Sequence, residues 1–171
     1  MKLNIYKMHS DASDLKYATT NSACFDISAH FHYQNSFKTY SKDNKEITIL
    51  GVQDEHGKAY VEVPGEWRIL IPTGLILDIP KEHCVKIYPR SGISTKKGLN
   101  LINCVGIIDA DYIEQLMIPV YNNSQERLRI YSGDRIAQGE LVRQEQAEIQ
   151  YISERPESKS NRNGGFGSTG V

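Results

Sequence analysis

The chain has 171 residues, of which 39% are hydrophobic and 24% charged, and its 20 basic and 21 acidic residues give a net charge of -1. This length predicts one domain, which buries roughly two-thirds of the surface of its unfolded chain. The composition excludes a disordered, collagen-like or disulfide-rich protein. The balanced charge excludes nucleic-acid binding through bulk positive charge, so an anionic ligand must be held by a local set of donors.

The cysteines and the N-terminal residues indicate the compartment. Cys24, Cys84 and Cys104 lie far apart and form no CxxC pair, which is typical of free, buried thiols in a reducing environment. The first residues lack the apolar run of a signal peptide. No stretch approaches the roughly 20 apolar residues of a membrane helix. We therefore expect a cytoplasmic protein that binds neither membranes nor nucleic acids.

Short runs of alternating hydrophobic residues dominate the chain. Strands are predicted at residues 67–71, 75–79, 84–88, 116–121 and 147–152. Pro, Gly and Asp separate these runs, which predicts an all-β sandwich, barrel or jelly roll. One short helix is expected at 91–98, where Ser91 can cap its start and Gly98 can stop it.

The domain organisation follows from composition. Residues 1–152 are predicted to form a β domain with an insertion at 34–66, which carries two strand-like runs around a turn at 54–57. The insertion is a candidate surface for an additional protein partner. Residues 153–171 form a polar, Gly-rich tail, which cannot build a core and is expected to be mobile when alone.

Two segments have the composition of phosphate-binding sites. In Pro89-Arg90-Ser91-Gly92, a forked cation and backbone N–H groups coincide with the predicted helix start; the alternative is an ordinary strand-to-helix connection. In the tail, consecutive glycines with Ser168 and Thr169 can cradle a phosphate, and Phe166 can stack on a base. The alternative for this segment is a terminus without a role.

Three further segments carry isolated carboxylates. Residues 106–112 predict a β-hairpin in which one aspartate acts as a general base, or in which Asp109 and Asp111 make turn hydrogen bonds. In residues 133–138, Asp134 can pair with a nearby arginine and Gln138 can donate to a phosphate, or the segment is a solvated turn. Asp26, alone on a strand, is most simply a structural residue.

Taken together and in order, these segments resemble the five motifs of the trimeric dUTPase family. The strongest matches are PRSG at 89–92, GIIDADY at 106–112, GDRIAQ at 133–138 and GGFGSTG at 164–170. The resemblance implies a jelly-roll-like β fold with one short helix, assembled as a homotrimer. It also implies Mg²⁺-dependent hydrolysis of dUTP to dUMP and pyrophosphate, which lowers dUTP and supplies dUMP for thymidylate synthesis.

The resemblance also assigns roles to individual residues. Asp109 matches the catalytic aspartate that deprotonates the attacking water, and Tyr112 matches the aromatic residue that packs on the deoxyribose. Asp26 matches a carboxylate that reaches the metal region through water. The matches to base and phosphate contacts are Arg90, Ser91, Gly92, Asn103, Gly106, Ile107, Ile108, Met117, Gln138, Arg162, Phe166, Gly167, Ser168 and Thr169.

Two other functions remain open at this point. A dCTP deaminase has a related fold but needs a glutamate for ammonia chemistry, and PRSG together with the tail motif speaks against it. A structural jelly-roll protein is compatible with the fold alone, although the ordered polar motifs do not fit that role. His30 and His32 would share a face of a strand over 27–33, but no further ligand lies at zinc spacing, so no zinc site is expected.

Overall fold

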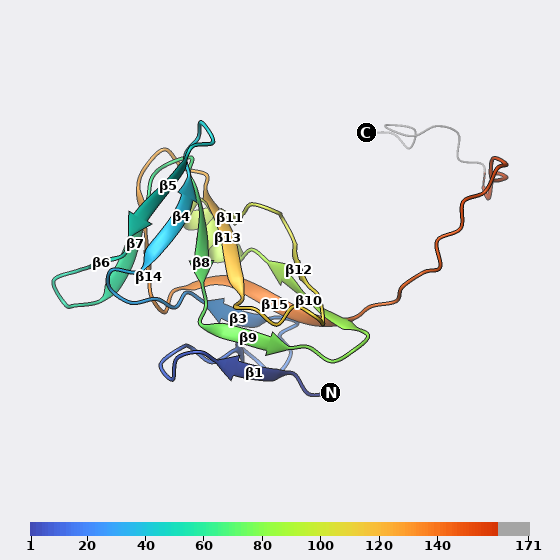
Figure 1. The fold of residues 1–171 in the computed structure, drawn as a ribbon, viewed down its shortest axis with the longest axis horizontal. Coiled ribbons are helices and arrows are strands. Elements are labelled where there is room, and N and C mark those ends of the chain that lie inside the picture. Colours follow the sequence, from blue (N-terminus) through green and yellow to red (C-terminus); the bar gives the residue numbers. More distant parts are fainter. Residues whose placement is uncertain (161–171) are drawn as a thin grey trace.

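The computed structural model describes residues 1–160, and within them it shows fifteen strands and one short helix (Figure 1). This confirms the predicted all-β class. The first five-stranded sheet has the order β12 (Gly106–Ile108), β10 (His83–Tyr88), β15 (Arg135–Arg143), β3 (Phe25–Ser28) and β2 (Lys16–Tyr17). The second has the order β11 (Leu99–Leu101), β13 (Met117–Asn122), β8 (Arg68–Pro72), β4 (Ser36–Tyr40) and β5 (Glu46–Leu50).

Two smaller sheets complete the fold. One contains β14 (Leu128–Tyr131), β7 (Ala59–Val63) and β6 (Val52–Gln53), and the other pairs β1 (Asn4–Lys7) with β9 (Leu75–Asp78). Every strand pair in residues 1–160 is antiparallel. Figure 1 shows the strands of the second sheet standing over those of the first. Such layers bury the apolar face of each sheet against the other.

One hydrophobic core joins these sheets. Ile27 and Val85 enter it from the first sheet, Ile71 and Val120 from the second and Val61 from the third, and none of them is more than 1% exposed. Alternation along the strands explains this burial, since residues two apart share a face. β8 illustrates it, with its buried residues alternating with half-buried ones.

Most of the predicted strands are present. The expected runs at 67–71, 75–79, 84–88 and 116–121 correspond to β8, β9, β10 and β13. The strand expected at 147–152 is wrong, because these residues are exposed and have no strand conformation. A polar alternating segment buries too little apolar surface to form a strand unless a partner strand is available.

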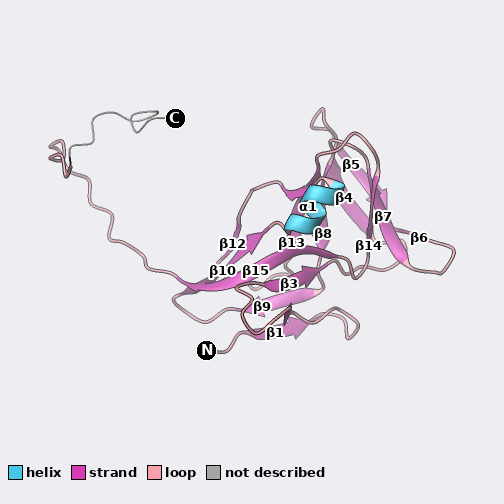
Figure 2. Cartoon of the chain, turned by 180° about the vertical axis from the view of Figure 1, so that it is seen from behind, coloured by secondary structure: helices cyan, strands magenta, loops and turns pink. Residues whose placement is uncertain are grey.

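The predicted helix is present as α1 (Ser91–Lys97), visible from the opposite side in Figure 2. It ends at Gly98, whose φ of 68° is the left-handed conformation that glycine adopts freely. Its start differs from the expectation. Arg90, not Ser91, is the N-cap residue, and no side chain caps the helix. Ser91 is the first helical residue, so its N–H is left for another acceptor.

The hairpin expected at 106–112 has a different arrangement. A turn is present, in which the Tyr112 N–H donates to the Asp109 carbonyl over 3.2 Å. The strands on either side of this turn do not pair with each other, because β12 pairs with β10 and β13 pairs with β8 and β11. The turn therefore passes from one five-stranded sheet to the other, which places it between them.

Residues 34–66 contain the expected turn, in which the Asp54 carboxylate accepts the N–H groups of His56 and Lys58 over 3.0 and 2.9 Å. This turn joins β6 to β7, which pair. The segment also contributes to the core, since Phe37 of β4 is 2% exposed and packs edge to face on Phe31. The interpretation of residues 34–66 as an insertion in a dUTPase-like domain stays a prediction.

Residues 145–160 leave the β domain in Figure 1 and are exposed throughout. The division of the chain at residue 152 stays a prediction. Of the three free cysteines, Cys84 is buried, Cys24 is partly buried and Cys104 is exposed, so the expected burial holds for Cys84 alone. None of the helices in residues 1–160 is long and apolar enough to cross a membrane.

Candidate active site

A cavity of about 260 Å³ opens between the two five-stranded sheets, next to the 109–112 turn. Its polar rim contains Asn103, Asp109 and Tyr112, and it also includes Met117. Three consecutive residues of β12, which is an edge strand of its sheet, also line the cavity: Gly106, Ile107 and Ile108. Its remaining wall is apolar and consists of Leu70, Ile87, Leu101, Ile118 and Pro119. This size and lining suit a small planar group with a few polar atoms at its edge.

Gly106 determines how closely the Asn103 amide lies to the strand. A Cβ on Gly106 would stand 3.4 Å from Asn103 Nδ2 and 3.2 Å from the Ile87 side chain. Without a side chain at this position, the amide and the backbone of β12 can meet the same ligand edge. A larger residue would crowd both neighbours, so local packing explains why a glycine occupies this position.

Asp109 follows β12 directly and lies at the rim of the cavity. Its side chain is exposed, and no residue in 1–160 donates a hydrogen bond to its carboxylate or to that of Asp111. Of the turn hydrogen bonds offered as the alternative role of these aspartates, the structure shows the one from the Tyr112 N–H to the Asp109 carbonyl, and none to either carboxylate within residues 1–160. The Tyr112 hydroxyl donates to the Gln115 carbonyl over 3.0 Å, which holds the aromatic ring beside the cavity.

A second cluster of polar side chains lies between the end of β10 and the start of α1. The Asp26 carboxylate on β3 accepts a hydrogen bond from Arg90 Nε over 2.7 Å and another from Arg135 Nη1 over 2.9 Å. Its side chain is only 17% exposed. Two charge-assisted hydrogen bonds to one half-buried carboxylate hold both guanidinium groups in place. Asp26 is therefore a positioning residue for the cations of this segment.

Gln138 belongs to the same group. It lies on β15 directly opposite Tyr88 on one side and Asp26 on the other, and its amide donates to the Pro89 carbonyl over 2.9 Å. Ser91 and Gly92 are exposed at the start of α1, and nothing lies within 4 Å of a Cβ placed on Gly92. Arg90, Gln138 and these free N–H groups together form a surface suited to an anion.

The structure thus brings the predicted residues together in two groups. The cavity collects Asn103, Gly106, Ile107, Ile108, Asp109, Tyr112 and Met117, whereas Arg90, Ser91, Gly92 and Gln138 form the anion-binding surface with Asp26. Both groups use β10, which carries Ile87 into the cavity and Arg90 beyond its end. None of the residues of the anion-binding surface lines the cavity within this single chain.

Several details differ from the sequence-based expectations. Asp134 pairs with neither arginine; it closes a turn in which its carboxylate accepts the Tyr131 N–H over 3.0 Å. Arg135, by contrast, was not expected to reach Asp26, and only the register between β15 and β3 places them together. The predicted tail residues Arg162, Phe166, Gly167, Ser168 and Thr169 lie outside the described residues.

The side chains near this site constrain how a divalent cation could be held. Both Asp26 oxygens already accept guanidinium hydrogen bonds, and no cluster of three carboxylates is present in residues 1–160. This donor set does not fit a cation ligated mainly by protein. It fits Mg²⁺ that retains most of its waters and takes its other ligands from a phosphate-containing substrate.

Comparisons with known proteins identify the family of the chain. The family model for dUTPase matches residues 56–170. The chain belongs to the dUTPase family. Deoxyuridine 5'-triphosphate nucleotidohydrolases from Finegoldia magna and Anaeromyxobacter sp. are 48% and 42% identical to this dUTPase over 103 and 110 residues, covering 60% and 63% of its chain and 71% of each relative.

Solved structures share the fold. A Staphylococcus bacteriophage 80alpha dUTPase with dUPNHPP has a TM-score of 0.73 at 23% identity, covering 99% of both chains. A dUTPase from phage phi11 of S. aureus, whose structure is described as showing a coordinated structural Mg(II) ion, has a TM-score of 0.68 at 19% identity and covers 90% of this chain and 98% of the phage protein. At these identities the likeness supports the fold and not the roles of individual residues.

Proposed function

We propose that this dUTPase hydrolyses dUTP to dUMP and pyrophosphate by attack of a water on the α-phosphorus, with Asp109 as the general base. The observation that carries the proposal is the cavity itself, in which the Asp109 carboxylate, the Tyr112 ring and the residues of the edge strand β12 line one base-sized space. Cleavage at this bond lowers dUTP and supplies dUMP for thymidylate synthesis.

The polar groups at the edge of the cavity recognise uracil through hydrogen bonds. The Asn103 amide and the backbone of Gly106, Ile107 and Ile108 offer donors and acceptors at fixed positions. A site built to hydrogen-bond uracil leaves some of these groups unpaired when cytosine enters, which is the situation in which binding discriminates most strongly. Tyr112 packs against the deoxyribose and leaves no room for a 2'-hydroxyl, and Met117 supports the base from the next strand.

Asp109 provides the chemistry. Its carboxylate has no protein partner in residues 1–160 and stands at the cavity rim, so it can accept a proton from a water placed beside the α-phosphate. An ionised carboxylate without competing donors is a suitable base for this transfer. The proton moves to an Asp109 oxygen as the water oxygen attacks phosphorus, and pyrophosphate leaves.

The phosphates are bound by the anion-binding surface. Arg90 donates to phosphate oxygens from the orientation that Asp26 imposes, and Ser91, Gly92 and Gln138 add further donors. The substrate phosphates and water molecules near Asp26 would hold Mg²⁺, which would neutralise charge on the phosphates. Asp26 therefore acts on both the cation and Arg90 without touching the reacting atoms.

A complete site requires more than one chain. We place the anion-binding surface of one subunit against the cavity of another in a homotrimer, since the two groups of residues form no common cavity within one chain. The tail, roughly 19 residues from 153, spans at most about 60 Å and can reach a neighbouring site. There, Arg162, Phe166, Gly167, Ser168 and Thr169 would close over the base and γ-phosphate. A purely monomeric species in sedimentation would contradict this assembly.

The decisive experiment measures pyrophosphate and ammonia release from dUTP, dCTP and UTP in the presence of Mg²⁺. We expect pyrophosphate from dUTP and a kcat/KM for dCTP lower by on the order of 10⁴-fold, because cytosine leaves buried polar groups unpaired. UTP is expected to be similarly poor. Ammonia release from dCTP would instead indicate a deaminase, and turnover of none of the three would indicate a structural or binding protein.

Replacing Arg90 tests the anion-binding surface. We expect Arg90→Gln to lower kcat/KM for dUTP by about 10- to 100-fold, because a hydrogen bond to a charged group contributes roughly 1.5–3 kcal/mol. Steady-state kinetics with dUTP measure this effect. The matched control is Arg129→Gln, which removes a similar arginine–carboxylate pair, Arg129 with Glu62 at 3.0 Å, on a different sheet. Equal losses in both variants would show that Arg90 has only a structural role.

A further inference from the structure

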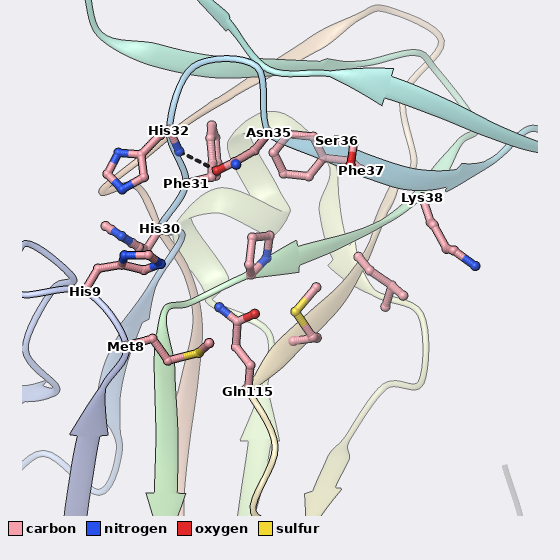
Figure 3. Close-up of a pocket in the computed structure, with 13 residues that line it drawn as sticks. Met8, His9, His30, Phe31, His32, Asn35, Ser36, Phe37, Lys38 and Gln115 are labelled. Atoms are coloured by element: carbon pink, nitrogen blue, oxygen red, sulfur yellow. Dashed lines mark hydrogen bonds between the residues drawn. The ribbon is translucent and has the colours of Figure 1, made fainter.

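Three histidines gather in a hollow that the proposed reaction does not use (Figure 3). His9 follows β1, and His30 and His32 precede β4. Their ring centroids form a nearly equal-sided triangle, with separations of 5.2, 5.4 and 5.0 Å. One nitrogen of each ring lies within 4.8 Å of the nitrogens of the other two. In the sequence only His30 and His32 form a recognisable pair, because His9 lies twenty-one positions before His30.

Packing alone does not explain why His30 buries an imidazole nitrogen that has no hydrogen-bond partner. Its side chain is 6% exposed, yet its Nε2 atom has no hydrogen-bond partner in the structure. The ring is held against Gly74, where an added Cβ would stand only 2.7 Å from His30 Cδ2. A buried polar atom without a partner carries an energetic penalty. A ligand bound to Nε2 would remove that penalty.

A carboxylate lies beside the same atoms. Asp11 Oδ1 is 3.7 Å from His30 Nε2, and Asp11 Oδ2 is 4.0 Å from His32 Nε2. These separations are too long for hydrogen bonds, but they place one carboxylate near the Nε2 atoms of both rings. The Asp11 side chain is 63% exposed and is therefore free to move closer.

The surroundings of His30 shift its pKa. Burial lowers the pKa of His30, and the nearby His32 and His9 rings lower it further, whereas Asp11 opposes the shift. A neutral imidazole is the form that offers a lone pair to a metal.

We propose that His9, His30 and His32 bind one Zn²⁺ ion, with Asp11 as the fourth ligand. Imidazole nitrogens and a carboxylate oxygen are ligands that Zn²⁺ accepts in a tetrahedral site. With Zn–N distances of about 2.0–2.1 Å, tetrahedral nitrogens lie roughly 3.3 Å apart. The ring nitrogens, which now lie within 4.8 Å of one another, must therefore approach by up to about 1.5 Å. The exposed His9 and His32 side chains can do this by rotation.

The ion would connect two loops that are distant in sequence. His9 and Asp11 belong to the loop after β1, and His30 and His32 to the connection from β3 to β4. Because Leu70 and Met117 line both this hollow and the active-site cavity, the bound ion would also stabilise one wall of the nucleotide pocket. Its primary role is structural, since no catalytic group lies among its ligands.

Metal binding to the full, untagged chain tests the proposal. After removal of metals with a chelator, Zn²⁺ is titrated in competition with a chromogenic chelator, and Co²⁺ replaces it for absorption spectroscopy. We expect one Zn²⁺ per chain, the visible absorption of tetrahedral Co²⁺, and a higher Tm in the presence of Zn²⁺. All three readouts are independent of dUTP hydrolysis.

Variants of the two exposed ligands test the site, and a variant of a distant histidine provides the control. His9→Ala and His32→Ala keep the buried His30 and are each expected to weaken Zn²⁺ binding by more than about 100-fold, since even residues that only support a ligand cost 10- to 100-fold. His56→Ala, an exposed histidine in the β6–β7 turn, should bind Zn²⁺ like the wild type. The proposal is overturned if the wild type binds Zn²⁺ no more tightly than His32→Ala, or if His56→Ala loses as much affinity.

Discussion

Replacement of Asp109 by asparagine is expected to lower kcat for dUTP by on the order of 10²- to 10⁴-fold. The amide has nearly the shape of the carboxylate but cannot accept the proton of the attacking water. Because the cavity wall is otherwise unchanged, KM should change far less than kcat. Steady-state pyrophosphate release, with binding of a non-hydrolysable dUTP analogue as a second measurement, separates the two effects.

Asp111→Asn is the matched control for this variant. Asp111 lies two residues further along the same turn, is equally free of hydrogen-bond donors among residues 1–160, and does not line the base-sized cavity. We expect its kinetics to stay close to those of the wild type. Full activity of Asp109→Asn, or an equal loss in both variants, would remove Asp109 from the proposed mechanism.

Phe37→Ala is expected to reduce the free energy of unfolding by about 3–5 kcal/mol, the usual cost of emptying a core site of this size. Phe37 is 2% exposed, and its ring lies 5.0 Å from that of Phe31 at an interplanar angle of 86°. Denaturant unfolding monitored by circular dichroism measures the loss.

The control for this variant is Leu50→Ala on the neighbouring strand β5. Leu50 lies in the same hairpin but is 57% exposed, so its truncation leaves no cavity and should change stability by less than about 1 kcal/mol. A small effect for Phe37→Ala would mean that residues 34–66 form a peripheral hairpin, which folds separately from the β domain.

Short-range features of the fold were accessible from the sequence. Alternating runs predicted β8, β9, β10 and β13, and the glycine at position 98 predicted the end of α1. These features depend on residues a few positions apart, which a pattern can show. The same reasoning failed for 147–152, because alternation says nothing about whether a partner strand is available.

The sequence predicted which residues belong to the candidate site, but not which carboxylate pairs with which arginine. The motif order indicated which residues gather around a nucleotide, and seven of them line one cavity. By contrast, the sequence suggested Asp134 as the partner of an arginine, whereas the structure shows Asp26 in that place, paired with Arg90 and Arg135.

By itself, therefore, the sequence determined the all-β class, the single helix and the membership of a nucleotide-hydrolysing family. Only the tertiary structure decided that Asp26 joins arginines 64 and 109 positions away, and that His9 completes a triangle with His30 and His32. Periodicity and motifs report local backbone preferences, whereas these contacts depend on strand register and sheet order, which bring together residues that are remote along the chain.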